Sequence, residues 1–69
     1  MGRTLTAVIH KEGNLFVADC PEIGTVSQGA TIDEAIGNLK EATELYLEEF
    51  PAEPAPRPLI TTFDVAADA

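Results

Sequence analysis

The chain has 69 residues and a formal net charge of −8, with four Lys and Arg against twelve Asp and Glu. A domain of this size buries only about 60% of the surface of its unfolded chain, so its stability is small and a partner subunit would add to it. The charge disfavours binding to nucleic acid and to anionic membranes. One cysteine and one histidine exclude an internal disulfide and a Cys/His metal site. We therefore expect a cytoplasmic protein without a metal or cofactor.

The first part of the chain has the pattern of a β-hairpin. Residues 3–10 alternate in polarity and are rich in Thr, Val and Ile, which is typical of a half-buried strand. A Glu-Gly turn at 12–13 leads into a second strand over residues 15–20. Closing the hairpin at this turn places Ile9 opposite Phe16.

A third strand and a long helix are expected next. Pro21 ends the second strand, and a short third strand follows over residues 25–29. Thr31 and Glu34 then form a capping box, in which each side chain bonds to the backbone N–H of the other residue. The helix is predicted over residues 32–50.

This helix has an apolar side and an acidic side. The apolar stripe recurs at the helical period and consists of Ile32, Ile36, Leu39, Thr43, Tyr46, Leu47 and Phe50. The opposite side carries the residues that we call the acidic helix face, namely Glu34, Glu41, Glu48 and Glu49 with Leu45 at their centre. A leucine in that position does not serve the core of a monomer.

The rest of the chain completes the expected sheet. Residues 51–58 contain four prolines and favour a stiff, extended connector, and residues 59–65 are predicted as a fourth strand. The fold class is thus α+β, with the order β-β-β-α-β in one domain over residues 1–69. The sheet is expected in strand order 3-2-1-4, with the helix on one of its faces.

The other face of this sheet is left without a cover. We call it the open sheet face and expect it to contain Val8, Leu15, Val17 and Ile60. Exposed apolar residues of this kind usually mark an interface, so a homodimer or higher homo-oligomer is expected.

No catalytic group emerges from the residue types. His10 and Cys20 fall on opposite faces of the hairpin, and they are best explained as a surface residue and a small core residue. A metal-dependent nuclease would need several converging carboxylates, and the expected first strand contains none. We therefore do not expect an enzyme.

The segment from Cys20 to the helix resembles the HicB family of antitoxins from toxin–antitoxin pairs. The matching positions occur in the same order as in the family and are Cys20, Pro21, Glu22, Ser27, Gln28, Gly29, Thr31, Glu34, Ala35, Asn38, Leu39, Glu41 and Ala42. The resemblance implies a degenerate ribonuclease-H-like fold that neutralises a small, basic, HicA-like RNase. Larger members of that family carry an additional DNA-binding domain, and we expect here a short, single-domain member without it.

Two functions remain open from the sequence. The first is a protein-binding antitoxin, and the alternative is a standalone homo-oligomeric domain that regulates or binds a small ligand. Residues expected to contact a toxin or a second copy are Glu34, Glu41, Leu45, Glu48, Glu49, Val8, Leu15 and Val17.

Overall fold

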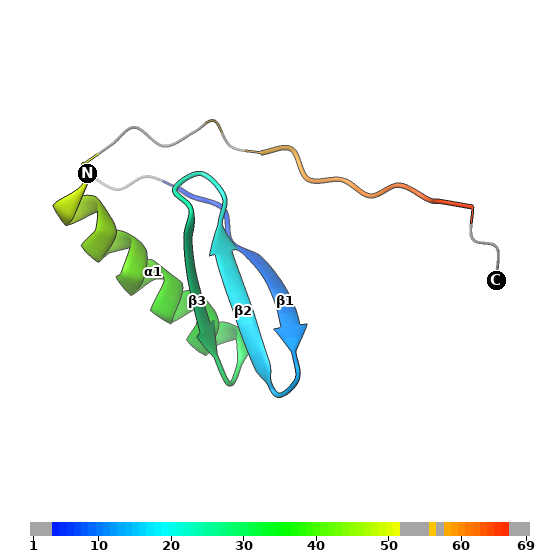
Figure 1. Cartoon of the computed structure of the whole chain (residues 1–69), viewed down its shortest axis with the longest axis horizontal. Coiled ribbons are helices and arrows are strands. Elements are labelled where there is room, and N and C mark those ends of the chain that lie inside the picture. The colour runs from blue at the N-terminus through cyan, green and yellow to red at the C-terminus, as the bar shows by residue number, and fades with distance from the viewer. Residues whose placement is uncertain (1–3, 52–55, 57, 67–69) are drawn as a thin grey trace.

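Three antiparallel strands and one helix make up the fold. The computed structural model describes residues 4–51, 56 and 58–66. Its elements in chain order are β1 (Val8–Glu12), β2 (Leu15–Cys20), β3 (Thr25–Gly29) and α1 (Ile32–Glu49). The sheet has the order β1-β2-β3, and α1 packs on one face, chiefly against β3 and β2 (Figure 1). The α+β class and the bounds of the second and third strands are confirmed. Over the described residues, no helix combines the length and apolarity that a membrane crossing requires.

The β1–β2 hairpin differs from the predicted one by two residues in register. Glu12 pairs with Leu15, so the turn is Gly13-Asn14, and Ile9 lies opposite Ala18 instead of Phe16. The difference arises because Gly13 takes the first turn position, where its φ is +59°. Side chains alternate between faces, so a shift of two keeps each one on its expected side.

The first strand is also shorter than the predicted span of 3–10, of which residue 3 lies outside the described part. Continuing the register of β1 and β2 would place Thr6 opposite Pro21, which has no N–H to donate. The ladder therefore begins at Val8. The Thr6 backbone N–H, which lies beyond the end of the ladder, donates to the carboxylate of Glu22, with both oxygens 3.1 Å from the nitrogen. Residues 4–7 thus lead into β1 without belonging to the regular ladder.

The helix begins as the sequence predicts, with one change. The Thr31 hydroxyl accepts a hydrogen bond from the Glu34 backbone N–H at 3.0 Å. The Glu34 carboxylate accepts from the N–H of Ala30 at 2.6 Å, one residue before the predicted donor. The helix ends at Glu49 instead of residue 50, and the N–H of Phe50, the C-cap residue, donates to the carbonyl of Tyr46.

The core is small and lies between α1 and β2. Its buried apolar residues are Ala18, Cys20, Ala35 and Leu39, with Leu5, Ile9, Phe16 and Ile23 packed against them. The helix therefore covers the face that the sequence predicts. Its buried stripe is narrower than expected, however, and runs through Ala35, Leu39 and Thr43. Because α1 lies over β3 and β2, the predicted core residues Ile32, Ile36, Tyr46 and Phe50 remain 40–59% exposed.

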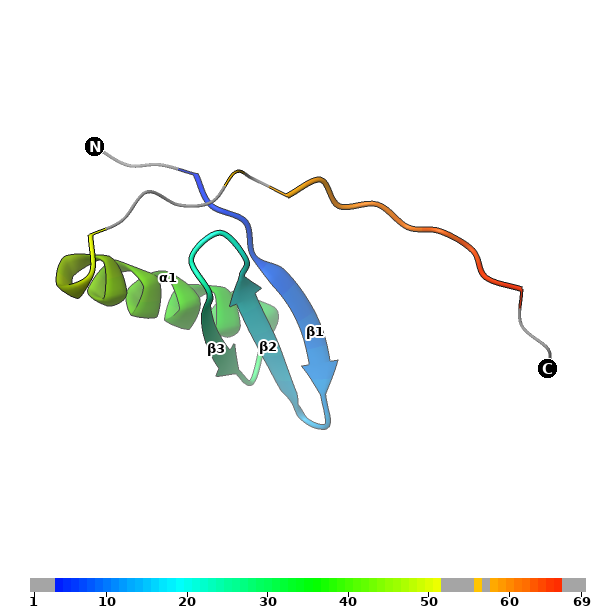
Figure 2. The same ribbon diagram turned by 45° about the horizontal axis from the view of Figure 1, so that its top comes forward.

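The predicted fourth strand is not formed. Residues 58–66 are described without a strand, and they run apart from the sheet and the helix in both ribbon views (Figures 1 and 2). The large apolar side chains of this segment are exposed, at 93% for Leu59, 64% for Ile60, 85% for Phe63 and 73% for Val65. The expected order 3-2-1-4 is therefore reduced to three strands. Of the connector over 51–58, the residues 52–55 and 57 lie outside the described part.

Candidate protein-binding surfaces

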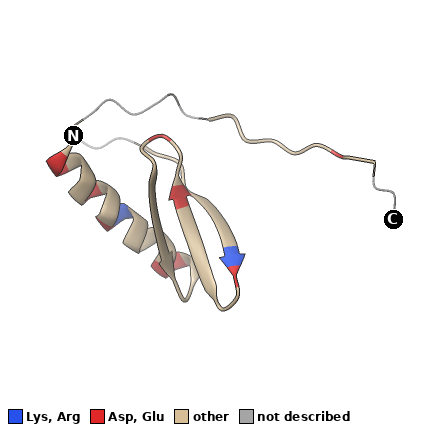
Figure 3. Ribbon diagram, viewed as in Figure 1, with Lys and Arg blue, Asp and Glu red and all other residues tan. Residues whose placement is uncertain are grey.

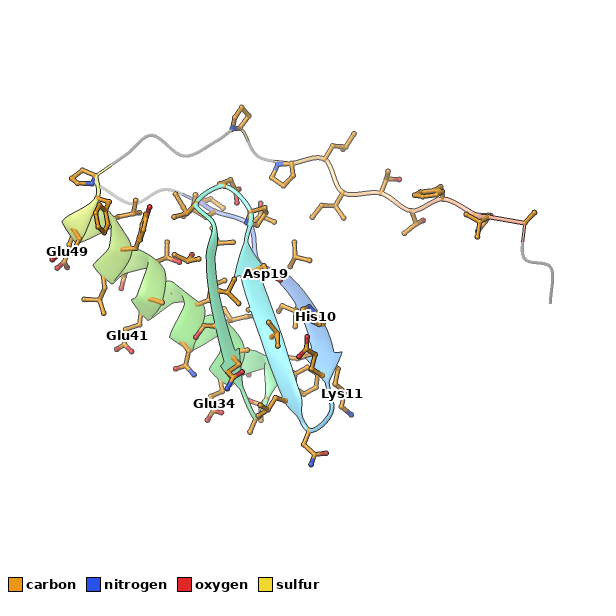
Figure 4. All side chains as sticks on the ribbon, in the orientation of Figure 1. His10, Lys11, Asp19, Glu34, Glu41 and Glu49 are labelled. Carbon is orange, nitrogen blue, oxygen red and sulfur yellow. The ribbon has the colours of Figure 1, made fainter. Side chains whose placement is uncertain are left out.

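The acidic helix face lies on the exposed side of α1. The helix carries six Asp and Glu residues and a single lysine (Figure 3). Glu34, Glu41 and Glu49 follow one another along its outer side (Figure 4). Leu45 is 58% exposed, as expected from the sequence, and stands three or four residues from its acidic neighbours. The arrangement is an apolar side chain within a rim of carboxylates.

One member of this face is already engaged within the domain. The Glu34 carboxylate holds the N–H of Ala30 at 2.6 Å and so fixes the start of α1. Its role in the cap is structural. The residues of the acidic helix face that remain for a partner are Glu41, Leu45, Glu48 and Glu49.

The end of α1 carries charges that oppose its own stability. Glu48 and Glu49 lie in the last turn, and that turn contains no basic residue. The C-terminal end of a helix is the negative end of its dipole, so each acid there costs about 0.3–1 kcal/mol. Departures from local stability rules are expected at functional sites. This face is therefore the strongest candidate for a binding surface on α1.

The open sheet face is only partly as predicted. Val8 and Leu15 are 40% and 38% exposed, and Val17 is partly buried. Ile60 is not on this face, because residues 59–65 do not join the sheet. Val26 was missed although it is 57% exposed. It pairs with Asp19 across the ladder, and the alternation of side chains in the third strand is the signal that places it there.

A polar group also lies on the open sheet face. The Nε2 of His10 is 3.0 Å from Glu12 Oε2, and its Nδ1 is 3.9 Å from Asp19 Oδ2. Glu12 belongs to β1, so the expectation that the first strand carries no acid is wrong. Within residues 4–51, 56 and 58–66, no three His, Cys, Asp or Glu side chains are placed to hold a metal ion.

A groove that the sequence did not reveal lies beside the start of β1. It has a volume of about 1090 Å³ and is bounded by Leu5, Thr6 and Ala7 on one side and by α1 on the other. Its apolar walls come from Leu5, Ala7, Ile36, Leu39 and Leu47, while Lys40, Glu44 and Glu48 lie at the polar parts of its lining. We call it the β1 groove.

The wall of this groove is held in place by a buried acid. Glu22 is only 7% exposed, and besides the Thr6 backbone N–H it accepts the Thr6 hydroxyl at 2.8 Å. The thiol of Cys20 lies 3.7 Å from its Oε1. Burial raises the pKa of this carboxyl, but the hydrogen bonds from Thr6 and Cys20 outweigh that effect, so its pKa lies below the ordinary value of 4.5.

Comparison with known proteins identifies the family of this chain. The chain is 46% identical over 50 residues to a UPF0150 protein of Helicobacter pylori, which covers 71% of this chain and 69% of the relative. It is 46% identical over 55 residues to a UPF0150 protein of Synechocystis sp., covering 77% of this chain and 70% of the relative. The chain belongs to the UPF0150 family. No family model and no solved structure matches it. Neither UPF0150 name states an activity or a partner, so the function is argued from the surfaces described above.

The buried acid makes the stability of this UPF0150 domain depend on pH. Because the pKa of Glu22 is lower in the folded state than in the unfolded state, its contribution is complete above the unfolded value. It is lost as the pH falls below about 4.5 and passes through the folded pKa. Glu22→Gln should remove this part of the acid dependence, as measured from urea unfolding midpoints between neutral and acid pH. Glu41→Gln, on the exposed side of α1, is the control and should keep it. An unchanged acid profile in Glu22→Gln would contradict the prediction.

Proposed function

We propose that this UPF0150 chain is a non-catalytic, cytoplasmic protein-binding domain that acts as an antitoxin and masks a small, basic, HicA-like RNase. The observation that carries this proposal is the exposed Leu45 within the acidic helix face. The family resemblance in the Cys20 to Ala42 segment supports the class of partner.

The chemistry of the face suits a basic protein. Exposed carboxylates around an apolar residue give long-range attraction to positive charge, together with a short-range anchor that excludes water. The net charge of −8 strengthens the attraction. The unfavourable position of Glu48 and Glu49 at the helix end is explained if their charges serve binding.

We also propose that the complete sheet has four strands in the order 3-2-1-4, as in a degenerate ribonuclease-H-like fold. Residues 59–65 alternate, with Leu59, Phe63 and Val65 on one side and Ile60 and Asp64 on the other. The β1 groove offers apolar walls beside the strand that such a fourth strand would join.

A second candidate function is a standalone homo-oligomeric domain. The exposed Val8, Leu15 and Val26 on the open sheet face favour it, because they form an apolar surface without a cover in the described chain. A homodimer through this face is compatible with binding a basic protein on α1.

Titration against the basic product of the neighbouring reading frame, made as an inactive variant, tests the antitoxin role. Association should be fast at low salt and slow by about tenfold or more at high salt, because it is steered by charge. Exposed glutamates contribute only about 0.2–1 kcal/mol each, so Glu41→Ala should mainly slow association. Glu12→Ala on β1 removes the same charge away from α1; it is the matched control and should slow association less than Glu41→Ala does. Absence of binding at both salt concentrations would leave the homo-oligomer as the function.

A further inference from the structure

The exposed segment 59–65 and the β1 groove have complementary surfaces. Leu59 and Phe63 are 93% and 85% exposed, more than any other large apolar side chain described. The β1 groove is walled by apolar side chains from β1's leading residues and from α1. Such exposure is unfavourable for a small domain in whose described part only four apolar residues are buried. Placing one surface on the other would bury both.

The outer edge of β1 can receive a strand. In the sheet, β1 pairs only with β2 over the described residues, so its other edge is open. At the opposite edge of the sheet, the side-chain amide of Asn38 already donates to the Gln28 carbonyl of β3 at 2.8 Å. Unpaired edges are the usual place for strand addition.

The connector favours a second copy as the source of the strand. The end of α1 and the start of β1 line the same groove, through Leu47 and Leu5. A strand from the same chain would therefore need only a short, folded-back link. Four prolines in residues 51–58 favour instead an extended link, which spans about 25 Å at 3.1 Å per residue. A stiff link of that length would carry the segment past its own groove, and in both ribbon views residues 58–66 run apart from the sheet and the helix (Figures 1 and 2).

We infer that two copies of this chain exchange residues 59–65, each segment lying beside β1 of the other copy with Leu59, Phe63 and Val65 in its β1 groove. The exchange is reciprocal and so forms a closed two-fold dimer. This inference rests on the proposed four-stranded sheet and does not depend on the basic partner.

Mixed-label NMR on the full chain tests the source of the strand. Carbon-13-labelled and unlabelled protein are unfolded together, refolded as a mixture, and compared with a uniformly labelled sample. Exchange predicts NOEs between Phe63 of one copy and Leu5 or Ile36 of the other. NOEs that appear only within one chain would overturn the exchange and uphold the four-stranded sheet. Absence of both kinds would overturn the exchange and the fourth strand together.

Sedimentation of two neighbouring variants gives an independent test. Phe63→Asp should raise the dimer dissociation constant at least ~100-fold, because a buried phenylalanine is lost at both symmetric sites. Thr62→Asp lies on the other side of the segment, next to Asp64, and should change it by no more than about twofold. Equal effects of the two changes, or a dimer that resists Phe63→Asp, would contradict the exchange.

Discussion

Replacing Gly29 with alanine should lower the free energy of unfolding by roughly 1–3 kcal/mol, a large share of what so small a core supplies. A Cβ at this position would lie 2.6 Å from the backbone nitrogen of Ala35 and 2.9 Å from the backbone carbon of Glu34. These are main-chain atoms at the start of α1, and they cannot move without shifting the helix from β3. Urea unfolding followed by circular dichroism measures the loss.

Gly37 provides the matched control for this change. It lies within α1, and apart from the adjoining backbone of the helix itself a Cβ there meets no described atom within 4 Å. Gly37→Ala should therefore stabilise the helix by about 0.5–1 kcal/mol, because alanine loses less backbone freedom than glycine. If both substitutions shift stability in the same direction, the close approach of β3 and α1 is not what requires Gly29.

Replacing Leu45 with glutamate should weaken binding of the basic partner by about 2 kcal/mol or more, which is roughly 30-fold. Leu45 is the apolar centre of the acidic helix face, and a charge there would have to be desolvated in the complex. The free domain should lose only about 1 kcal/mol of stability, because the side chain is 58% exposed before the change and each new like-charge pair with Glu41, Glu48 or Glu49 costs about 0.2–0.5 kcal/mol. Calorimetric titration and urea unfolding measure the two quantities separately.

Val26→Glu is the matched control for the partner surface. Val26 is 57% exposed, nearly as much as Leu45, but it lies on the open sheet face. Its substitution should leave partner binding unchanged. Tight binding by Leu45→Glu together with loss of binding by Val26→Glu would move the partner site from α1 to the sheet.

The features that could be predicted from the sequence depend on neighbouring residues. The helix start follows from Thr31 and Glu34, whose bond forms at 3.0 Å, and the helix end follows from Pro51. The bounds of the second and third strands follow from the glycine and proline positions around them. Each of these signals acts within a few residues, where chain stereochemistry decides the conformation.

The features that could not be predicted depend on contacts between distant residues. The hairpin register changed because two adjacent turn placements satisfy the same alternation, and only the φ of Gly13 separates them. The width of the helix stripe depends on how α1 lies across the sheet, which leaves Ile36 40% exposed. Residues 59–65 have the composition of a strand, but a strand also needs a neighbour, and no local pattern supplies one.

Among the residues of the candidate surfaces, those whose exposure depends on local periodicity could be predicted, and those that depend on contacts between distant residues could not. The exposure of Leu45 and of the helix glutamates follows from helical periodicity, which the sequence displays. The buried carboxylate of Glu22 and the β1 groove could not be found, because they join Thr6 to residues fourteen or more positions away. Glu22 follows Pro21, at which the β1–β2 ladder is interrupted, and the Thr6 N–H that the ladder no longer holds finds its acceptor in the Glu22 carboxylate.

The hydrogen bond between Glu22 and Thr6 continues, one step before β1, the alternation of backbone groups that the pairing with β2 sets along this strand. Since the Thr6 N–H turns toward β2, and backbone groups alternate in direction along a strand, those of Ala7, Ile9 and Lys11 turn outward. An incoming strand must pair with this odd-numbered set. Side chains alternate along the incoming strand, so only one of two neighbouring registers buries its apolar side. A slip by one residue would place Asp64 under the helix in place of Phe63. The β1–β2 ladder, which the Glu22 bond continues as far as Thr6, thus decides which side of a joining strand would be buried.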